Sequence, residues 1–181
     1  LGELKTAQIA ALTTANLAVI TTDQLTAFTS AQIAALTTAQ IVALTTAQVS
    51  TLSTEQLSSL TTAQLVKMQT VDFAAITTDQ ITSLTTKQFA ALSTAQVVAL
   101  TTDQVATLTT AQLASLTTAQ VVSMQTDDLA AITTEQISAL KTAQTTALTT
   151  AQVVALTTDQ VANLTTAQLA AFTTAQLVKM E

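Results

Sequence analysis

The sequence predicts an all-α fold, a solenoid of short capped helices with one helix in each eight-residue repeat. Three observations support this prediction: the eight-residue period runs through the chain, two columns of each repeat are apolar, and each repeat contains a helix-start signal. Counting from Leu4, there are 22 such octads, and the last begins at Phe172. A β-solenoid is the alternative, but its corners usually require Gly, Asn, Asp or Pro, and this chain is rich in Ala, a poor strand former.

Composition excludes most chemistry. Of 181 residues, 49% are hydrophobic and 9% are charged, and the chain contains no His and no Cys. This removes the usual base of a catalytic triad and the commonest ligands of transition metals. The five basic residues are all lysines and the net charge is −6, which is unfavourable for binding phosphates. No apolar run reaches the roughly 18 residues of a membrane span. We therefore predict that the chain is not an enzyme, binds no cofactor or nucleic acid, and is not inserted in a membrane.

Two columns of the octad supply the predicted core. Position 1 is apolar in every octad, and position 6 is apolar in all but one, where Thr145 stands. Position 4 is variable and carries seven of the eleven acidic residues, so we expect it to face water. The four phenylalanines lie in the apolar columns and are predicted to be buried: Phe28, Phe73, Phe89 and Phe172.

One long helix does not explain the period. Eight residues at about 100° each advance by about 800°, so equivalent positions rotate by about 80° per octad and the apolar columns spread around the cylinder. A short helix in each octad avoids this drift. Each helix then has about one and a half turns, well below the ~12 residues at which an isolated helix becomes marginal, so stacking must stabilise it.

The segment L-T-T-A-Q-I carries the start signal, and two residues compete for the N-cap. With the cap at position 2, Gln at position 5 is N3 and completes a capping box, and positions 1 and 6 are the two sites of a hydrophobic staple. Position 3, however, always keeps a hydroxyl, whereas position 2 is Lys or Gln in four octads. As structural caps we assign the position 3 threonines and position 5 glutamines of four octads, namely Thr62, Thr94, Thr118, Thr150, Gln64, Gln96, Gln120 and Gln152.

A longer repeat of seven octads overlies the first. Residues 68–123 match residues 124–179 at 41 of 56 positions, and residues 12–67 form a weaker copy. Val at position 7 recurs at intervals of alternately three and four octads. As in a heptad repeat, this alternation marks one face and predicts a coil with about 3.5 octads, or 28 residues, per turn. We expect residues 1–181 to form a single repeat array.

Two octads depart from the pattern. Asp72 and Asp128 replace the column Gln, and the same octads carry Gln69 and Gln125 at position 2. As weak metal candidates, the two aspartates could supply carboxylate oxygens to Ca²⁺, although no DxDxDG calcium-loop pattern is present. The alternative is structural: the next residue, Thr70 or Thr126, caps each helix alone and the aspartate favours its start.

The outer surface leaves several binding hypotheses open. An acidic stripe at position 4 could attract cations, the Thr columns could order water on ice, and the outer face could meet a partner protein. Because an uncapped solenoid end exposes apolar residues, end-to-end self-association is a further expectation. A solvated acidic face and inward polar columns that satisfy backbone groups explain the same residues without any ligand.

Two families resemble the chain. TTAQVVAL (149–156) and TTDQVANL (157–164) resemble the helix start of the DNA-reading repeats of TAL effectors, but that family's Gly-containing loop and basic residues have no counterpart here, so DNA binding is not carried over. The pattern of LTTAQ units punctuated by M-Q-T-x-D-L/F-A-A-I resembles octad arrays of very long bacterial proteins described as adhesin-like, RTX-type or haem-utilisation proteins. That resemblance spans residues 4–181. It implies a spacer, stalk or scaffold in a large protein that is secreted or displayed on the bacterial surface.

Overall fold

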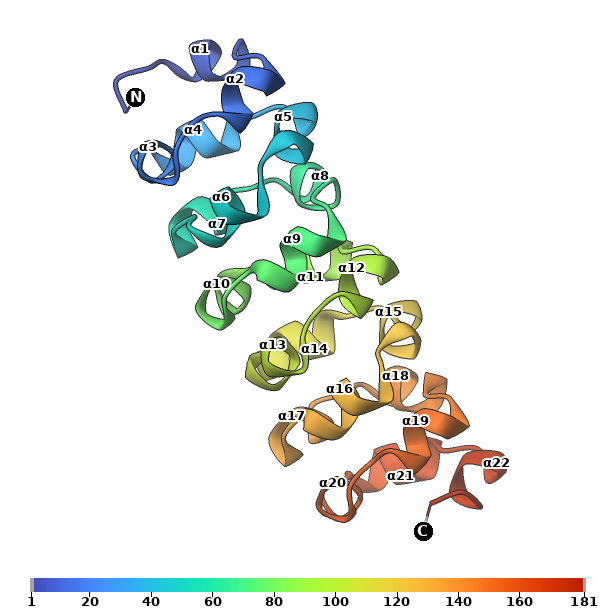
Figure 1. Cartoon of the computed structure of the whole chain (residues 1–181). Coiled ribbons are helices and arrows are strands. Elements are labelled where there is room, and N and C mark those ends of the chain that lie inside the picture. Colours follow the sequence, from blue (N-terminus) through green and yellow to red (C-terminus); the bar gives the residue numbers. More distant parts are fainter. Residues whose placement is uncertain (1, 181) are drawn as a thin grey trace. The chain divides into compact units, whose positions relative to one another are not determined.

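The computed structural model describes residues 2–180, which divide into two compact units between Leu92 and Ser93. All regular elements in this range are α-helices of four to six residues, 22 in number, and the range contains no strand (Figure 1). The all-α prediction is confirmed, with one helix in each octad. Each unit is described by itself below.

The helices of the first unit follow one another at eight-residue intervals. They are α1 (Thr6–Ala10), α2 (Thr14–Ala18), α3 (Thr22–Thr26), α4 (Ser30–Ala34), α5 (Thr38–Ala43), α6 (Thr46–Ser50), α7 (Thr54–Ser58), α8 (Thr62–Leu65), α9 (Thr70–Ala75), α10 (Thr78–Ser83) and α11 (Thr86–Ala91).

The second unit continues with the same spacing. Its helices are α12 (Thr94–Val98), α13 (Thr102–Thr107), α14 (Thr110–Ser115), α15 (Thr118–Ser123), α16 (Thr126–Ala131), α17 (Thr134–Ser138), α18 (Thr142–Ala147), α19 (Thr150–Val154), α20 (Thr158–Ala162), α21 (Thr166–Ala171) and α22 (Thr174–Leu177).

Two extended residues make the corner between consecutive helices. Between α5 and α6, Leu44 has φ −62° and ψ 139°, and Thr45 has φ −81° and ψ 155°. These are β-region angles that any L-residue adopts, and no described residue has a positive φ. The chain therefore changes direction at every octad without the glycines or prolines that most turns require.

The two apolar columns form the core of each unit, as predicted. Ile41 at position 6 is 0% exposed and Leu44 at position 1 is 3% exposed, and the four phenylalanines are all buried. Thr145 occupies a position 6 site and is also buried, and its hydroxyl donates to the carbonyl oxygen of Lys141 at 3.2 Å. The polar side chain is thus satisfied within its own helix and does not interrupt the column.

Each helix packs against the helix three octads away. In the first unit α6 contacts α9 and α7 contacts α10, and Figure 1 shows the latter pair in successive layers. In the second unit α13 contacts α16 and α18 contacts α21. Hydrogen bonds between layers join residues 28, 30 or 31 apart, which is between three and four octads. This spacing agrees with the predicted turn of about 3.5 octads.

Candidate functional site

The position 5 glutamine completes the capping box at the start of each ordinary helix. In α20, Gln160 Oε1 accepts the backbone N–H of Thr157 at 2.8 Å, and Thr157 Oγ1 accepts the backbone N–H of Gln160 at 3.2 Å. The pair satisfies two donors that have no partner inside the helix. The predicted column glutamines accept the N–H of their cap residue in the same way, at 2.6 to 3.0 Å: Gln64, Gln96, Gln120 and Gln152.

The other end of the same amide connects successive turns. Gln160 Nε2 donates to the carbonyl oxygens of Ile132 at 2.7 Å and Leu129 at 2.9 Å. In the first unit, Gln40 Nε2 donates to those of Leu12 at 2.7 Å and Ile9 at 2.9 Å. These acceptors lie in the last turn of a helix and one or two residues after the helix ends, where carbonyl groups are not all used by the helix itself. A glutamate could accept at the cap but could not donate, so the column requires an amide.

The N-cap is position 2, and the assignment of position 3 as the cap was wrong. The hydroxyls that accept the N3 N–H belong to Thr61, Ser93, Thr117 and Thr149. These four residues are extended, with ψ between 155° and 160°, which lets the side chain turn back toward the helix start. The residues that follow them are the first residues of α8, α12, α15 and α19: Thr62, Thr94, Thr118 and Thr150.

The two aspartate octads begin their helices without a side-chain cap. The N-caps of α9 and α16 are Gln69 and Gln125, and neither side chain makes a cap hydrogen bond. Thr70 and Thr126 are the first helical residues, so the expectation that they act as lone caps was also wrong, for the same backbone reason. Because Asp72 and Asp128 also replace the column Gln, these octads lack its amide donor to the preceding turn.

Asp72 and Asp128 point into the interior of their units. They are 1% and 2% exposed, respectively. Asp72 Oδ1 accepts the hydroxyl of Thr46 at 2.9 Å, and Asp128 Oδ1 accepts that of Thr102 at 2.8 Å. Each threonine lies 26 residues earlier, at position 3 of its octad, and is the first residue of a helix in the preceding turn. The second oxygen, Oδ2, has no hydrogen-bond partner in either residue, although both atoms are buried.

The position 2 glutamine replaces part of the missing amide. Gln69 Nε2 donates to the carbonyl oxygen of Val42 at 3.1 Å, and Gln125 Nε2 donates to that of Val98 at 3.2 Å. Each acceptor lies 30 residues before the aspartate, where a column Gln also donates, as Gln160 does to Ala130. The paired change of both residues in one octad thus moves the donor from position 5 to position 2.

Burial has the largest effect on the pKa of the Asp128 carboxyl group. It raises the pKa of Asp128, and the negative charge of Asp127 raises it further. Hydrogen bonds from the Thr102 hydroxyl and the Gln125 backbone N–H act in the opposite direction and are outweighed. At Glu55, an exposed position 4 acid, a backbone hydrogen bond and the Ser53 hydroxyl lower the pKa instead. The surroundings of the two carboxyl groups therefore shift the pKa in opposite directions.

The surroundings of the two aspartates bear on the calcium hypothesis. Ca²⁺ takes six to eight oxygen ligands, usually with several carboxylates. Within residues 2–180 there is no cluster of three or more acidic side chains that could hold a metal ion. Asp72 and Asp128 each lie beside a threonine hydroxyl, and the position 4 acids lie on the outer side of their helices: Asp23, Glu55, Asp79, Asp103, Asp127, Glu135 and Asp159.

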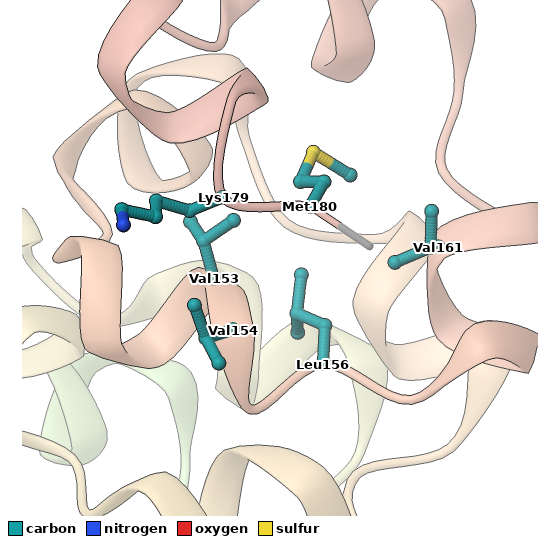
Figure 2. Close-up of a pocket in the computed structure, with 6 residues that line it drawn as sticks. All are labelled: Val153, Val154, Leu156, Val161, Lys179 and Met180. Atoms are coloured by element: carbon teal, nitrogen blue, oxygen red, sulfur yellow. The ribbon is translucent and has the colours of Figure 1, made fainter.

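A cavity of about 300 Å³ lies in the second unit beside α19. Figure 2 shows Met180 above Leu156, with Val153 and Val161 on either side, while the Lys179 side chain extends away from the thioether. Val154 completes the lining. Four aliphatic side chains, one thioether and one ammonium group offer no acid and base pair for catalysis.

Comparison with known proteins identifies the repeat. The sequence profile of the ALTTAQ repeat matches residues 1–30, 18–54, 30–62, 65–102, 73–110, 121–158 and 130–166, which together cover most of the chain. The chain belongs to the ALTTAQ repeat family. No curated protein matches it. In the ALTTAQ octad, the Thr–Thr pair supplies the cap and the first helical residue, and the Gln supplies both the capping oxygen and the amide donor between turns. None of the helices described in this ALTTAQ repeat protein is long and apolar enough to cross a membrane.

Proposed function

We propose that the chain is a non-catalytic structural region, a spacer, stalk or scaffold within a large bacterial protein that is secreted or displayed on the cell surface. The observation that carries the proposal is the glutamine contact between turns, which recurs with the same offset within each unit. Gln40 reaches back 28 residues to Leu12, and Gln168 reaches back 28 residues to Leu140. The repeat family supports a structural role, since its matches cover most of the chain.

The physical consequence is that the array can be lengthened by adding octads. Because each octad binds its sequence neighbours and the octads of adjoining turns, every added octad repeats the same contacts. Such an array can grow in length without redesign of its core, which suits a spacer. The interior columns are largely apolar, and the exposed position 4 is variable and carries seven of the acidic residues, so the core and the solubility depend on different positions of the octad.

Deletion of repeats tests the proposal. Removal of residues 12–67, seven octads, should shorten the particle in proportion to its residue count and leave unfolding free energy per residue nearly unchanged. Small-angle X-ray scattering measures the first quantity and urea unfolding the second. Removal of the single octad 36–43 is the comparison, because it should disturb the alternation of three and four octads. A collapsed particle or a large loss per residue after the 56-residue deletion would contradict a modular spacer.

Location needs its own experiment. Antibodies raised against this chain should label intact, unpermeabilised cells of the source bacterium. Labelling that appears only after the cells are permeabilised would contradict the surface proposal, while leaving the spacer proposal to the deletion experiment.

A further inference from the structure

Asp128 stands where the array needs a donor. In ordinary octads, the column Gln donates to the position 1 carbonyl 28 residues earlier, as Gln136 does to Leu108 at 2.6 Å. At Asp128 the equivalent acceptor is the carbonyl of Leu100, and Gln125 Nε2 is directed instead to Val98. An ionised carboxylate is only an acceptor and cannot serve the Leu100 carbonyl, whereas a protonated one has a donor O–H.

The local charges favour the protonated form. The helices that pack against α16 are α13 and α19. The titratable side chains on these three helices are Asp103 of α13 and Asp127 of α16, both exposed, together with Asp128 itself, while α19 has none. None of the three carries a lysine, so no cation on them stabilises a buried carboxylate. A buried charge without a partner is costly, and neutralisation relieves that cost.

We propose that Asp128 is a proton-dependent latch between α16 and the preceding turn. In the neutral acid, Oδ1 accepts the Thr102 hydroxyl and Oδ2–H donates to the Leu100 carbonyl oxygen, so the carboxyl group accepts one hydrogen bond from the preceding turn and donates another to it. Loss of the proton to solvent converts Oδ2 into a second acceptor, which removes the donated hydrogen bond and leaves a negative charge in the interior. The turn is therefore held more tightly in acid than at neutral pH.

The sign of the pH dependence follows from the folded and unfolded states. Burial raises the pKa of Asp128 above its ordinary value of 3.8, so the folded chain binds the proton more tightly than the unfolded chain. The stabilisation is complete below the ordinary pKa and is lost as the pH rises through the folded-state pKa. Ordinary salt-bridged carboxylates have the opposite dependence, which makes the latch distinguishable.

Asp128→Asn tests the latch in the 181-residue chain, because the amide keeps an acceptor at Oδ1 and supplies a permanent N–H donor. Thermal melts of both proteins are recorded from pH 3 to pH 8 with EDTA and at constant ionic strength. We expect equal Tm values near pH 3 and a Tm several degrees higher for the variant near pH 8. Asp159→Asn, which neutralises an exposed position 4 acid of α20, is the matched control and should show no such divergence. Parallel curves for the wild type and Asp128→Asn would overturn the proposal.

Two further measurements locate the proton. In ¹³C-detected NMR, the carboxyl carbon of Asp128, assigned by its loss in the variant, should titrate at a higher pH than an aspartate in an unstructured peptide. Titration at or below that reference would show an ionised acceptor and overturn the latch. Melts repeated with CaCl₂ in place of EDTA examine the competing explanation. A calcium-dependent rise in Tm of the wild type that Asp128→Asn abolishes would identify a cation site and would also overturn it, whereas no response to calcium supports the proton.

Discussion

In the second unit, α16 and α20 bind their neighbouring turns with different side chains. From α20, Gln160 caps its own helix and donates to Leu129 and Ile132 at the end of α16. In α16 two side chains share this role, because Gln125 donates to Val98 and Asp128 accepts from Thr102. Both helices begin from an extended N-cap, with φ −69° and ψ 152° at Gln125 and φ −72° and ψ 157° at Thr157. What the fold requires is therefore a side-chain link across the turn, and Gln is the residue that supplies the acceptor and the donor together.

The same comparison applies between the two aspartate octads. Asp72 and Asp128 share the threonine contact and the partnerless Oδ2. They differ at position 4, which is Val71 in α9 and Asp127 in α16. The first octad thus has the altered hydrogen bonds without an adjacent charge, and the second has both. This pair separates the effect of geometry from that of electrostatics.

The largest expected effect concerns the core of α16. Leu129→Ala should reduce the free energy of unfolding by about 2–5 kcal/mol, because it opens a cavity at a fully buried site. Val161→Ala, at the same column of α20, should cost less because Val161 is half-buried. Urea unfolding followed by circular dichroism measures both. Equal losses would mean that the two octads depend equally on position 6.

The next effect concerns the amide of α20. Gln160→Glu keeps a cap acceptor but removes the donor to the carbonyl groups of Leu129, Ala130 and Ile132, and each buried group left unsatisfied costs about 1–3 kcal/mol. Gln24→Glu is the matched control, since Gln24 also accepts the backbone N–H of its cap residue, Thr21, but is exposed. The urea midpoint should fall for the first variant and change little for the second. Similar shifts for both would mean that the position 5 glutamine stabilises the fold through capping alone.

A smaller effect distinguishes the two threonines at the start of α20. Thr157→Ala removes the cap oxygen and should cost about 1 kcal/mol, whereas Thr158→Ala alters the first helical residue and should cost a few tenths. The same urea measurements apply, and a larger loss for Thr158→Ala would contradict position 2 as the cap.

In α16, where Gln125 makes no cap hydrogen bond, Gln125→Thr together with Asp128→Gln restores the octad sequence and should raise the urea midpoint.

The smallest effect concerns the charge beside Asp128. Asp127→Val reproduces the position 4 residue of α9 and removes a charge that raises the pKa of Asp128. Less stability is then lost as the pH rises, and Tm near neutral pH should increase by about 1 °C, since an exposed charge acts weakly through solvent. Melts at pH 3 and pH 7 measure the difference. A steeper pH dependence in Asp127→Val than in the wild type would contradict the assigned repulsion.

The local rules of helix initiation predicted much of the fold. The staple spacing of positions 1 and 6 identified the core, including Phe73 and Phe89, and the variability of position 4 identified the solvent face. The choice of cap was wrong at Thr62 and its equivalents, because two adjacent threonines offer the same hydroxyl and only backbone angles select between them. The seven-octad grouping into 12–67, 68–123 and 124–179 stays a prediction.

The aspartate sites show where prediction from sequence stops. The paired change of Gln125 and Asp128 indicated a rewritten cap, and a calcium site was one hypothesis. Nothing in the sequence pointed to Thr102, which lies 26 residues before Asp128 and looks like every other position 3 threonine. The contact depends on the number of octads in a turn, and the alternation of the position 7 valines was the one signal that bore on that number.

The sequence by itself determined the octad, the helix in each octad, the buried and exposed columns and the lack of His and Cys chemistry. These follow from interactions within eight residues, where spacing along the chain fixes which groups meet. Only the tertiary structure decided that the Gln amide bonds to carbonyls 28 and 31 residues away, and that Asp72 and Asp128 are buried with one partnerless oxygen each. Those contacts join successive turns, and their partners are set by the pitch of the coil, a property of many octads packed together.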